Sequence, residues 1–301
     1  MSQANAFLPT TLKEVRARDW EQLDVILFTG DAYVDHPSFG IPVIGRVLKD
    51  AGYRVAIVPQ PNWEDDLRDF KKLGQPRLFF GVSAGAMDSM VNHYTARKRI
   101  RSNDAYTPGN QAGFRPDYPT LVYTKAIKQH FPDTPVIIGG VEASLRRYTH
   151  YDYWQNELMK GILYDSGADM MVYGMGEKTI LQIADLLEKG INFQDLDTIP
   201  QTSIIRSNEQ TQKILNDRKV IRLHSHDECI QDKRKFAENF AIIEVESNRT
   251  LPETIIQECD GQTIIVHPPL PILKEKELDR IHDLPFTRYS SSIFCLGKVI
   301  P

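Results

Sequence analysis

The chain has 301 residues, of which 41% are hydrophobic and 25% are charged, as is typical of a globular protein with a sizeable core. Its formal charge of −4 argues against an electrostatic footprint for nucleic acid over the whole surface, although it leaves a local basic patch open. No apolar run approaches the length of a bilayer span and the amino terminus lacks the apolar core of a signal peptide, so we expect a cytoplasmic protein with no membrane partner.

Three cysteines lie far apart along the chain, at Cys229, Cys259 and Cys295. An odd number at this spacing contains neither a disulfide framework nor a CxxC metal-binding pair. We therefore expect reduced thiols and no metal site built from them.

Short apolar runs alternate with helix-like segments from residue 24 onward. The run at 24–30 predicts a strand, the spacing of Ile44, Val47 and Leu48 predicts a helix, and 54–58 predicts a second strand. Such alternation is typical of a parallel sheet with crossover helices, so we predict an α/β fold with a Rossmann-like, doubly wound, mainly parallel sheet. Further elements are expected at 63–74 (helix), 77–85 (strand), 120–131 (helix), within 134–145 (strand), at 169–173 (strand) and through Ile180 to Leu187 (helix).

The pattern changes beyond Gly190. The charged segment 226–246 predicts one amphipathic helix, and 254–267 predicts a hairpin because Asp260-Gly261 suits a type I′ turn. Prolines and charges after this hairpin indicate a connector. The expected domains are a Rossmann-like domain (1–190), a small α+β appendage (191–270), and a connector with the carboxyl-terminal tail (271–301).

Glycines follow several of the predicted strands. In an open α/β sheet, ligands bind beyond the carboxyl ends of the strands, where glycine backbones and helix amino termini converge. Tight turns explain any one of these glycines, but four such loops together favour a ligand-facing edge. We predict that a small-molecule cofactor or ligand would contact Gly30, Asp31, Ser83, Gly85, Gly139, Gly140, Glu142, Gly174, Gly176 and Glu177.

The stretch GMGEKT at 174–179 is close to two nucleotide-binding motifs and satisfies neither. A P-loop requires GxxxxGK[ST], and a dinucleotide fingerprint requires a glycine where Thr179 stands. Glu177 at the start of a helix is favourable to the helix dipole whatever the function. The motif by itself therefore does not predict nucleotide binding.

Asp31, Asp35 and His36 stand together in the loop after the first predicted strand. They are capable of acid–base chemistry or metal binding, yet such sites usually draw partners from other elements. Asp and His also fix turns and cap helices, and Pro37-Ser38 just before a predicted helix favours this structural role.

Two segments combine cations with aromatic rings: 97–119, which begins RKRIRSNDAY, and 146–154, which reads RRYTHYDYW. Such residues are able to bind phosphates or stack on a base, but a short basic run is usually a solvated surface, so we favour a solvated surface over a nucleic-acid partner. A polar loop as long as the first segment is uncommon in a compact domain and indicates a lid or a docking surface. Together the two segments form a candidate polar contact face.

Four stretches closely resemble the amino-terminal region of YgiQ-type radical SAM proteins. They are TGDAYVDHPSFGIPVIGRVLKDAGYRVAIVPQPNW, LFFGVSAGAMDSMVNHYTARKRIRSNDAYTPGNQAG, VIIGGVEASLRRYTHYDYW and DMMVYGMGEKTI. The resemblance covers most of residues 7–288. It implies a cobalamin-binding-type α/β domain preceding a radical SAM barrel, with a [4Fe-4S] cluster and S-adenosylmethionine bound by the full-length protein.

The cluster of that family is held by a CxxxCxxC loop, whose three thiolates leave one iron open for S-adenosylmethionine. This sequence contains no such triplet, so we predict no metal or catalytic residue of its own. We expect the tail SSSIFCLGKVIP to be a truncated or out-of-frame end, with the partner barrel missing or in a neighbouring frame. The DxHxxG loop that supplies an imidazole to cobalt is also absent, so cobalamin binding lacks its motif.

These observations predict a non-catalytic accessory domain that works with a radical SAM barrel. The alternative is an autonomous module that binds a corrinoid, a nucleotide or a similar small molecule at the glycine loops. A third hypothesis is a hydrolase or metal enzyme that uses Asp31, Asp35 and His36.

Overall fold

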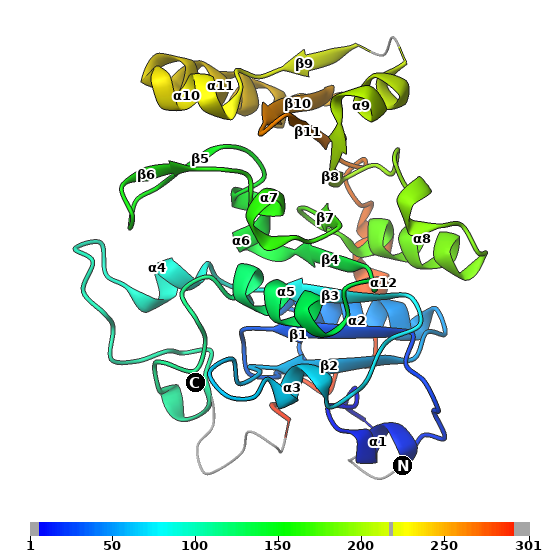
Figure 1. Ribbon diagram of the computed structural model, residues 1–301. Coiled ribbons are helices and arrows are strands. Elements are labelled where there is room, and N and C mark those ends of the chain that lie inside the picture. The colour runs from blue at the N-terminus through cyan, green and yellow to red at the C-terminus, as the bar shows by residue number, and fades with distance from the viewer. Residues whose placement is uncertain (1–5, 217–218, 292–301) are drawn as a thin grey trace.

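The computed structural model describes residues 6–216 and 219–291, in which nine strands form one sheet (Figure 1). The order across the sheet is β2-β1-β3-β4-β7-β8-β11-β10-β9, and a two-stranded sheet β5-β6 lies apart from it. The strands are β1 (Val25–Thr29), β2 (Val55–Pro59), β3 (Phe79–Ser83), β4 (Val136–Gly139), β5 (His150–Asp152), β6 (Glu157–Met159), β7 (Met170–Val172), β8 (Thr202–Ser207), β9 (Val220–Arg222), β10 (Thr254–Cys259) and β11 (Gln262–Val266).

The helices connect these strands and cover the sheet. None of those in the described ranges has both the length and the apolar character needed to cross a membrane. They are α1 (Leu12–Arg16), α2 (Gly40–Asp50), α3 (Arg68–Lys71), α4 (Ser89–His93), α5 (Pro119–His130), α6 (Gly140–Leu145), α7 (Ile162–Ser166), α8 (Glu177–Glu188), α9 (Asn208–Leu215), α10 (His226–Gln231), α11 (Lys233–Ser247) and α12 (Glu275–His282), with short 3₁₀ turns at η2 (Pro108–Asn110) and η3 (Phe193–Asp195).

The first five strands of the main sheet run parallel, in the order β2-β1-β3-β4-β7. This is the flavodoxin-like variant of the doubly wound fold. The predicted mainly parallel α/β sheet is confirmed.

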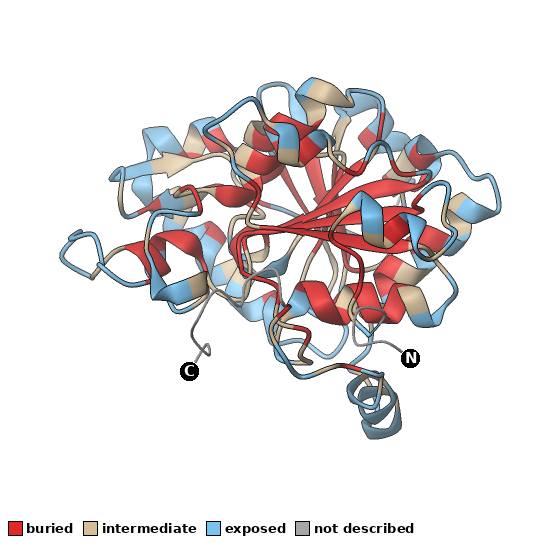
Figure 2. Ribbon diagram, turned by 90° about the horizontal axis from the view of Figure 1, so that it is seen from below, coloured by how far each residue is buried: buried red, intermediate tan, exposed pale blue. Residues whose placement is uncertain are grey.

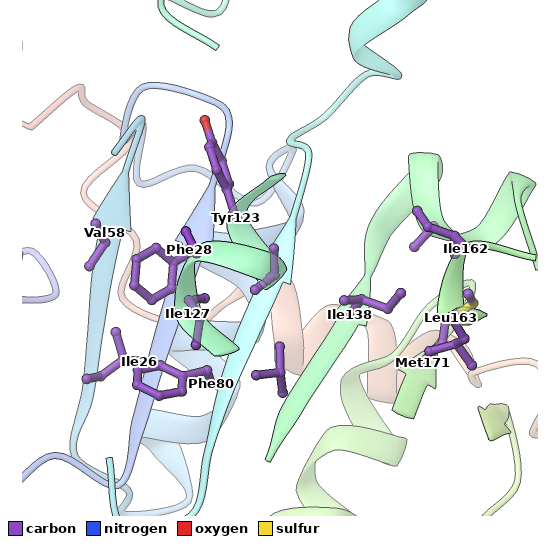
Figure 3. Close-up of a cluster of buried hydrophobic side chains, with 14 of the residues drawn as sticks. Ile26, Phe28, Val58, Phe80, Tyr123, Ile127, Ile138, Ile162, Leu163 and Met171 are labelled. Carbon is purple, nitrogen blue, oxygen red and sulfur yellow. The ribbon is translucent and has the colours of Figure 1, made fainter. Parts of the chain in front are cut away.

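Alternate residues of the central strands point to opposite faces of the sheet, and helices bury both faces (Figure 2). Val25 and Leu27 of β1 pack with α2 and α8, whereas Ile26 and Phe28 pack with α3 and α5. The second face continues across the sheet to α7, whose Leu163 lies beside Met171 of β7 in Figure 3. Apolar side chains therefore pack on both faces of the sheet and fix the position of the edge at which the parallel strands end.

The sheet continues beyond residue 190 with no break in its hydrogen bonding. β8 pairs antiparallel with β7, and β11 pairs antiparallel with β8. The predicted hairpin is confirmed: β10 and β11 are antiparallel neighbours, and both Asp260 and Gly261 have the positive φ that a type I′ turn requires. The appendage is thus joined to the parallel sheet by backbone hydrogen bonds, while its division into a separate domain stays a prediction.

Two helix predictions are wrong in extent, because aspartates interrupt the backbone. The helix predicted at 63–74 shrinks to α3, since Asp65 and Asp66 accept hydrogen bonds from backbone N–H groups two residues on and Leu67 is left-handed. The single helix predicted at 226–246 is two, α10 and α11. They meet at Asp232, whose side chain caps α11 at Arg234.

The predicted connector folds back onto the loop after β1. Helix α12 buries none of its residues, but Phe286 beyond it packs against Val43 and Val47 of α2. The backbone N–H of Thr287 donates to the Asp35 carboxylate over 2.8 Å. Much of the predicted aberrant tail, including Cys295, lies outside the described residues.

Replacing Ile127 of α5 by alanine should lower the free energy of unfolding by about 2–5 kcal/mol, because its fully buried side chain fills the layer between α5 and β3. The measurement is chemical denaturation followed by circular dichroism. Ile272→Ala removes the same atoms from a side chain that is 95% exposed and should change the value by less than about 0.5 kcal/mol. Equal losses in the two variants would contradict this packing.

Candidate functional site

A cleft opens where the parallel strands end. The carboxyl ends of β1, β3, β4 and β7 share one edge of the sheet, and the chain order reverses there, with β2 on one side of β1 and β3 on the other. Open α/β sheets bind ligands at such switch points. The cleft has a volume of about 550 Å³ and lies between the loops that lead into α2, α4, α6 and α8.

The walls of this strand-end cleft are mostly apolar. Its polar side chains are the hydroxyls of Ser38, Ser83 and Ser144 and the carboxylate of Glu177. An apolar body with a few polar groups is the usual composition of a small-molecule site. The larger apolar side chains of the lining are Leu27, Ile41, Ile44, Val82, Ile137, Ile138, Val141, Leu145, Val172 and Ile180.

Seven of the ten residues proposed from sequence line the cleft, namely Ser83, Gly85, Gly139, Gly140, Gly174, Gly176 and Glu177. Gly30, Asp31 and Glu142 lie outside the lining. Sequence reasoning missed the contribution of α2, because the helical spacing that includes Ile44 indicates a core face and does not distinguish it from a cleft wall. Whether any of these residues binds a cofactor stays a prediction.

Close contacts between the strand-end loops account for two of the glycines. Gly85 has φ +117°, and a Cβ added there would lie 2.2 Å from Asp31 Oδ1. Gly140 has φ +83°, and its Cβ would lie 2.5 Å from Ser83 Oγ. A side chain is excluded at both positions by backbone conformation and by space. Their glycine identity is therefore explained without a ligand.

A buried ion-pair network supports the first of these loops. The guanidinium of Arg115 donates two hydrogen bonds to Asp104 over 2.9 and 3.0 Å, and its Nη1 lies 3.1 Å from Asp31 Oδ1. Burial raises the pKa of Asp31 to about 6, against the lowering effect of Arg115 and of the Ala86 N–H. Burial also opposes ionisation of Asp104, but Arg115 lowers the pKa of Asp104 overall.

The other two members of the acidic loop have separate partners. Asp35 is fully buried in an ion pair with Arg46 of α2. His36 Nδ1 accepts the backbone N–H of Ser38 over 3.1 Å, which is the turn-fixing role favoured from sequence. Asp31, Asp35 and His36 therefore do not converge on one point, and no group of three or more potential metal-binding side chains is found in 6–216 and 219–291.

Glu142 lies behind the cleft and joins three helices. It belongs to α6 and is 1% exposed, yet it accepts backbone N–H groups from Thr120 of α5 (3.1 Å) and Ser89 of α4 (3.5 Å). Burial raises the pKa of Glu142 to about 7, although Arg146 and the Thr120 hydrogen bonds lower it. Its carboxyl group is thus a positioning element for the cleft loops.

Glu177 begins α8, as predicted, and reaches the cleft from the helix amino terminus. Burial raises the pKa of its carboxyl group, while its own backbone N–H and His282 lower it. Together with the serine hydroxyls it gives the cleft a small number of polar contacts within an apolar wall.

Comparison with known proteins identifies the family. The radical SAM N-terminal family matches residues 7–300. The chain is 58% identical over 295 residues to a UPF0313 protein of Porphyromonas gingivalis, and 52% identical over 306 residues to a UPF0313 protein of Bacteroides thetaiotaomicron. The chain belongs to the radical SAM N-terminal family. The resemblance seen in the sequence is confirmed.

The match to UPF0313 proteins extends over nearly the whole chain but not over the whole of its relatives. It covers 98% of this chain against 46% of the Porphyromonas gingivalis protein and 49% of the Bacteroides thetaiotaomicron protein. A UPF0313 protein of Geobacter sulfurreducens, 44% identical, is matched over 46% of its length. The chain therefore spans about half the length of the curated relatives it matches.

Gly85→Ala should destabilise this radical SAM N-terminal region by about 2 kcal/mol more than Gly52→Ala. Both alanines adopt a positive φ, but the new Cβ at 85 meets the Asp31 carboxylate whereas the one at 52 meets nothing within 4 Å. Denaturant titration of the two variants measures the difference. Matching free energies of unfolding would show that the loops do not approach as described.

Glu142→Gln should flatten the dependence of stability on pH. The folded pKa of Glu142 is about 7, against an ordinary value of 4.5. The protonated carboxyl group therefore makes its full contribution to the free energy of unfolding below pH 4.5, and this contribution is lost as pH rises through about 7. Because glutamine stays neutral, the free energy of unfolding of the variant should rise relative to that of the wild type by up to about 3 kcal/mol as pH increases from 4.5 to about 8. Glu209→Gln on exposed α9 is the control, and parallel pH profiles for wild type and Glu142→Gln would contradict the assignment.

Proposed function

We propose that this chain is the amino-terminal accessory region of a UPF0313-type radical SAM iron–sulfur protein and does not hold the cluster itself. The family match supports the first part of this proposal. The observation that carries the second part is the arrangement of cysteines: the sequence contains three, and no two of them are closer than 30 positions. A CxxxCxxC site needs three within eight positions.

The two cysteines that the structure describes do not fit a cluster. Cys229 and Cys259 are both buried. Burial raises the pKa of each thiol, that of Cys259 to about 11, whereas iron–sulfur ligands are thiolates. In addition, Cys229 Sγ accepts a hydrogen bond from Asn239 over 3.2 Å. We therefore assign both thiols to packing and route no chemistry through them.

The strand-end cleft is the part of this region that we assign to contact with the reaction domain. Its lining includes two exposed apolar side chains, Val141 (46%) and Leu145 (68%). Exposed apolar side chains around an apolar cavity mark a surface that another body covers. The curated relatives are about twice as long as this chain, so the radical SAM domain of such a protein is the proposed body.

A corrinoid in the cleft has less support. The DxHxxG motif is absent from the sequence, and His36, the histidine nearest to the cleft loops in sequence, is turned to the Ser38 backbone and is not part of the lining. No axial imidazole is therefore available from that loop. Apolar walls and serine hydroxyls keep an autonomous small-molecule module as the second candidate.

Anaerobic reconstitution with iron and sulfide tests the proposal. This chain and the full-length Porphyromonas gingivalis relative are treated side by side, and the absorbance of a [4Fe-4S] cluster and formation of 5′-deoxyadenosine from S-adenosylmethionine are measured. We expect both signals in the relative and neither in this chain. A cluster and 5′-deoxyadenosine from this chain alone would contradict the accessory role, and cobalamin retained through desalting would favour the autonomous module.

A further inference from the structure

Two loops far apart in sequence meet on one side of the molecule. The loop after α4 turns back on itself through a bridge between Tyr94 and Ile100, and the β5–β6 hairpin lies next to it (Figure 1). We call their shared exposed surface the basic–aromatic face. It consists of Arg97, Lys98, Arg99, Arg101, Tyr151 and Tyr153.

Aromatic and cationic contacts hold the two loops together. The rings of Tyr94 and Trp154 have centroids 5.1 Å apart, and Lys98 Nζ lies 4.8 Å from the ring centroid of Tyr153. Lys98 also donates to the Trp154 carbonyl over 3.0 Å, and the Tyr153 hydroxyl donates to the carbonyl of Ala96 over 2.9 Å. The face is therefore a built surface joined by side chains from both loops.

Among residues 6–216 and 219–291, the positive charges of this face have no acidic partners. Within the described part of the chain, Arg97, Arg99 and Arg101 make no ion pair, and Arg101 Nε donates only to a backbone carbonyl, that of Tyr94. Asp117, the carboxylate at the base of the loop, is occupied by His93 and the Tyr94 hydroxyl. Four exposed cations therefore concentrate positive potential on a protein whose net charge is −4.

We propose that the basic–aromatic face binds single-stranded nucleic acid. Three of its four cations are arginines, whose planar guanidinium groups match phosphate oxygens in pairs. Tyr151 and Tyr153 of the hairpin are 49% and 48% exposed, and Tyr153 lies against Lys98. Cations that track a backbone, next to rings on which bases stack, are the two components of a sequence-tolerant single-strand site. This inference does not depend on the radical SAM proposal.

Two other polyanions match this surface less well. A membrane would need a contiguous apolar area, yet Ile100 is the one large aliphatic residue in 95–103 and stands between two arginines. An acidic protein segment would use the charges but leave the exposed tyrosines without a role. Nucleic acid uses both kinds of side chain.

Fluorescence anisotropy with fluorescein-labelled 20-nucleotide oligouridylate and oligothymidylate tests the proposal on the 301-residue chain. Binding should weaken with salt with a log–log slope of about −3, since each of four phosphates contributes about −0.7 in a single strand. Arg97→Ala/Arg99→Ala/Arg101→Ala should reduce the slope to about −1 and weaken binding at 50 mM salt about tenfold or more. Tyr151→Ala should weaken binding about fivefold with the slope unchanged.

The matched control is Arg222→Ala/Arg234→Ala/Arg280→Ala, which removes three exposed arginines elsewhere and should leave affinity within about twofold of wild type. Thermal melting checks that each variant is folded. The proposal is overturned if neither oligonucleotide binds at 50 mM salt, or if both triple variants behave alike. It is also overturned if polyglutamate displaces the oligonucleotides as well as unlabelled RNA does, or if only phosphatidylserine vesicles bind through the same arginines.

Discussion

The buried guanidinium of Arg115 connects the strand ends to the long loop between α4 and α5. A fully buried charge is tolerated only when its hydrogen bonds and its counter-charges are supplied, and here Asp104 and Asp31 supply them from two different loops. Because Asp31 follows β1 and Asp104 belongs to the long loop, neither loop can move away without leaving uncompensated charge behind. This constraint holds the loop after β1 against the long loop, which also carries the cations at 97–101.

The shape of the cleft follows from how closely the strand-end loops approach one another. Gly85 and Gly140 permit contacts with Asp31 and Ser83 that any side chain would block. Glu142 then joins α6 to the first turns of α4 and α5 through backbone N–H groups. Bare backbone lines the cleft as a consequence of this packing. A glycine pattern at strand ends is therefore a signature of loop packing as well as of ligand contact.

The two proposed surfaces have different chemistry and lie on different elements. The cleft is apolar and faces outward from the ends of β1, β3, β4 and β7, which suits contact with a second domain. The basic–aromatic face is formed by a loop and a hairpin outside the main sheet, where Arg97, Arg99 and Arg101 are exposed. Taken together, the two proposals would bring a polyanion near a reaction domain.

The sequence alone determined the features that depend on local order: the alternation of strands and helices, the Asp260-Gly261 hairpin, the position of Glu177 at a helix start, and the family. Each of these is written within a few consecutive residues, as periodicity, turn chemistry or motif. Only the tertiary structure decided which partner each buried charge takes, so that Asp35 pairs with Arg46 and not with a neighbour in its own loop. It also decided that the hairpin extends the main sheet, and that Lys98 lies against Tyr153 of a distant loop. Those outcomes depend on contacts between distant segments, whose energies are set by burial and by charge pairing that no local pattern records.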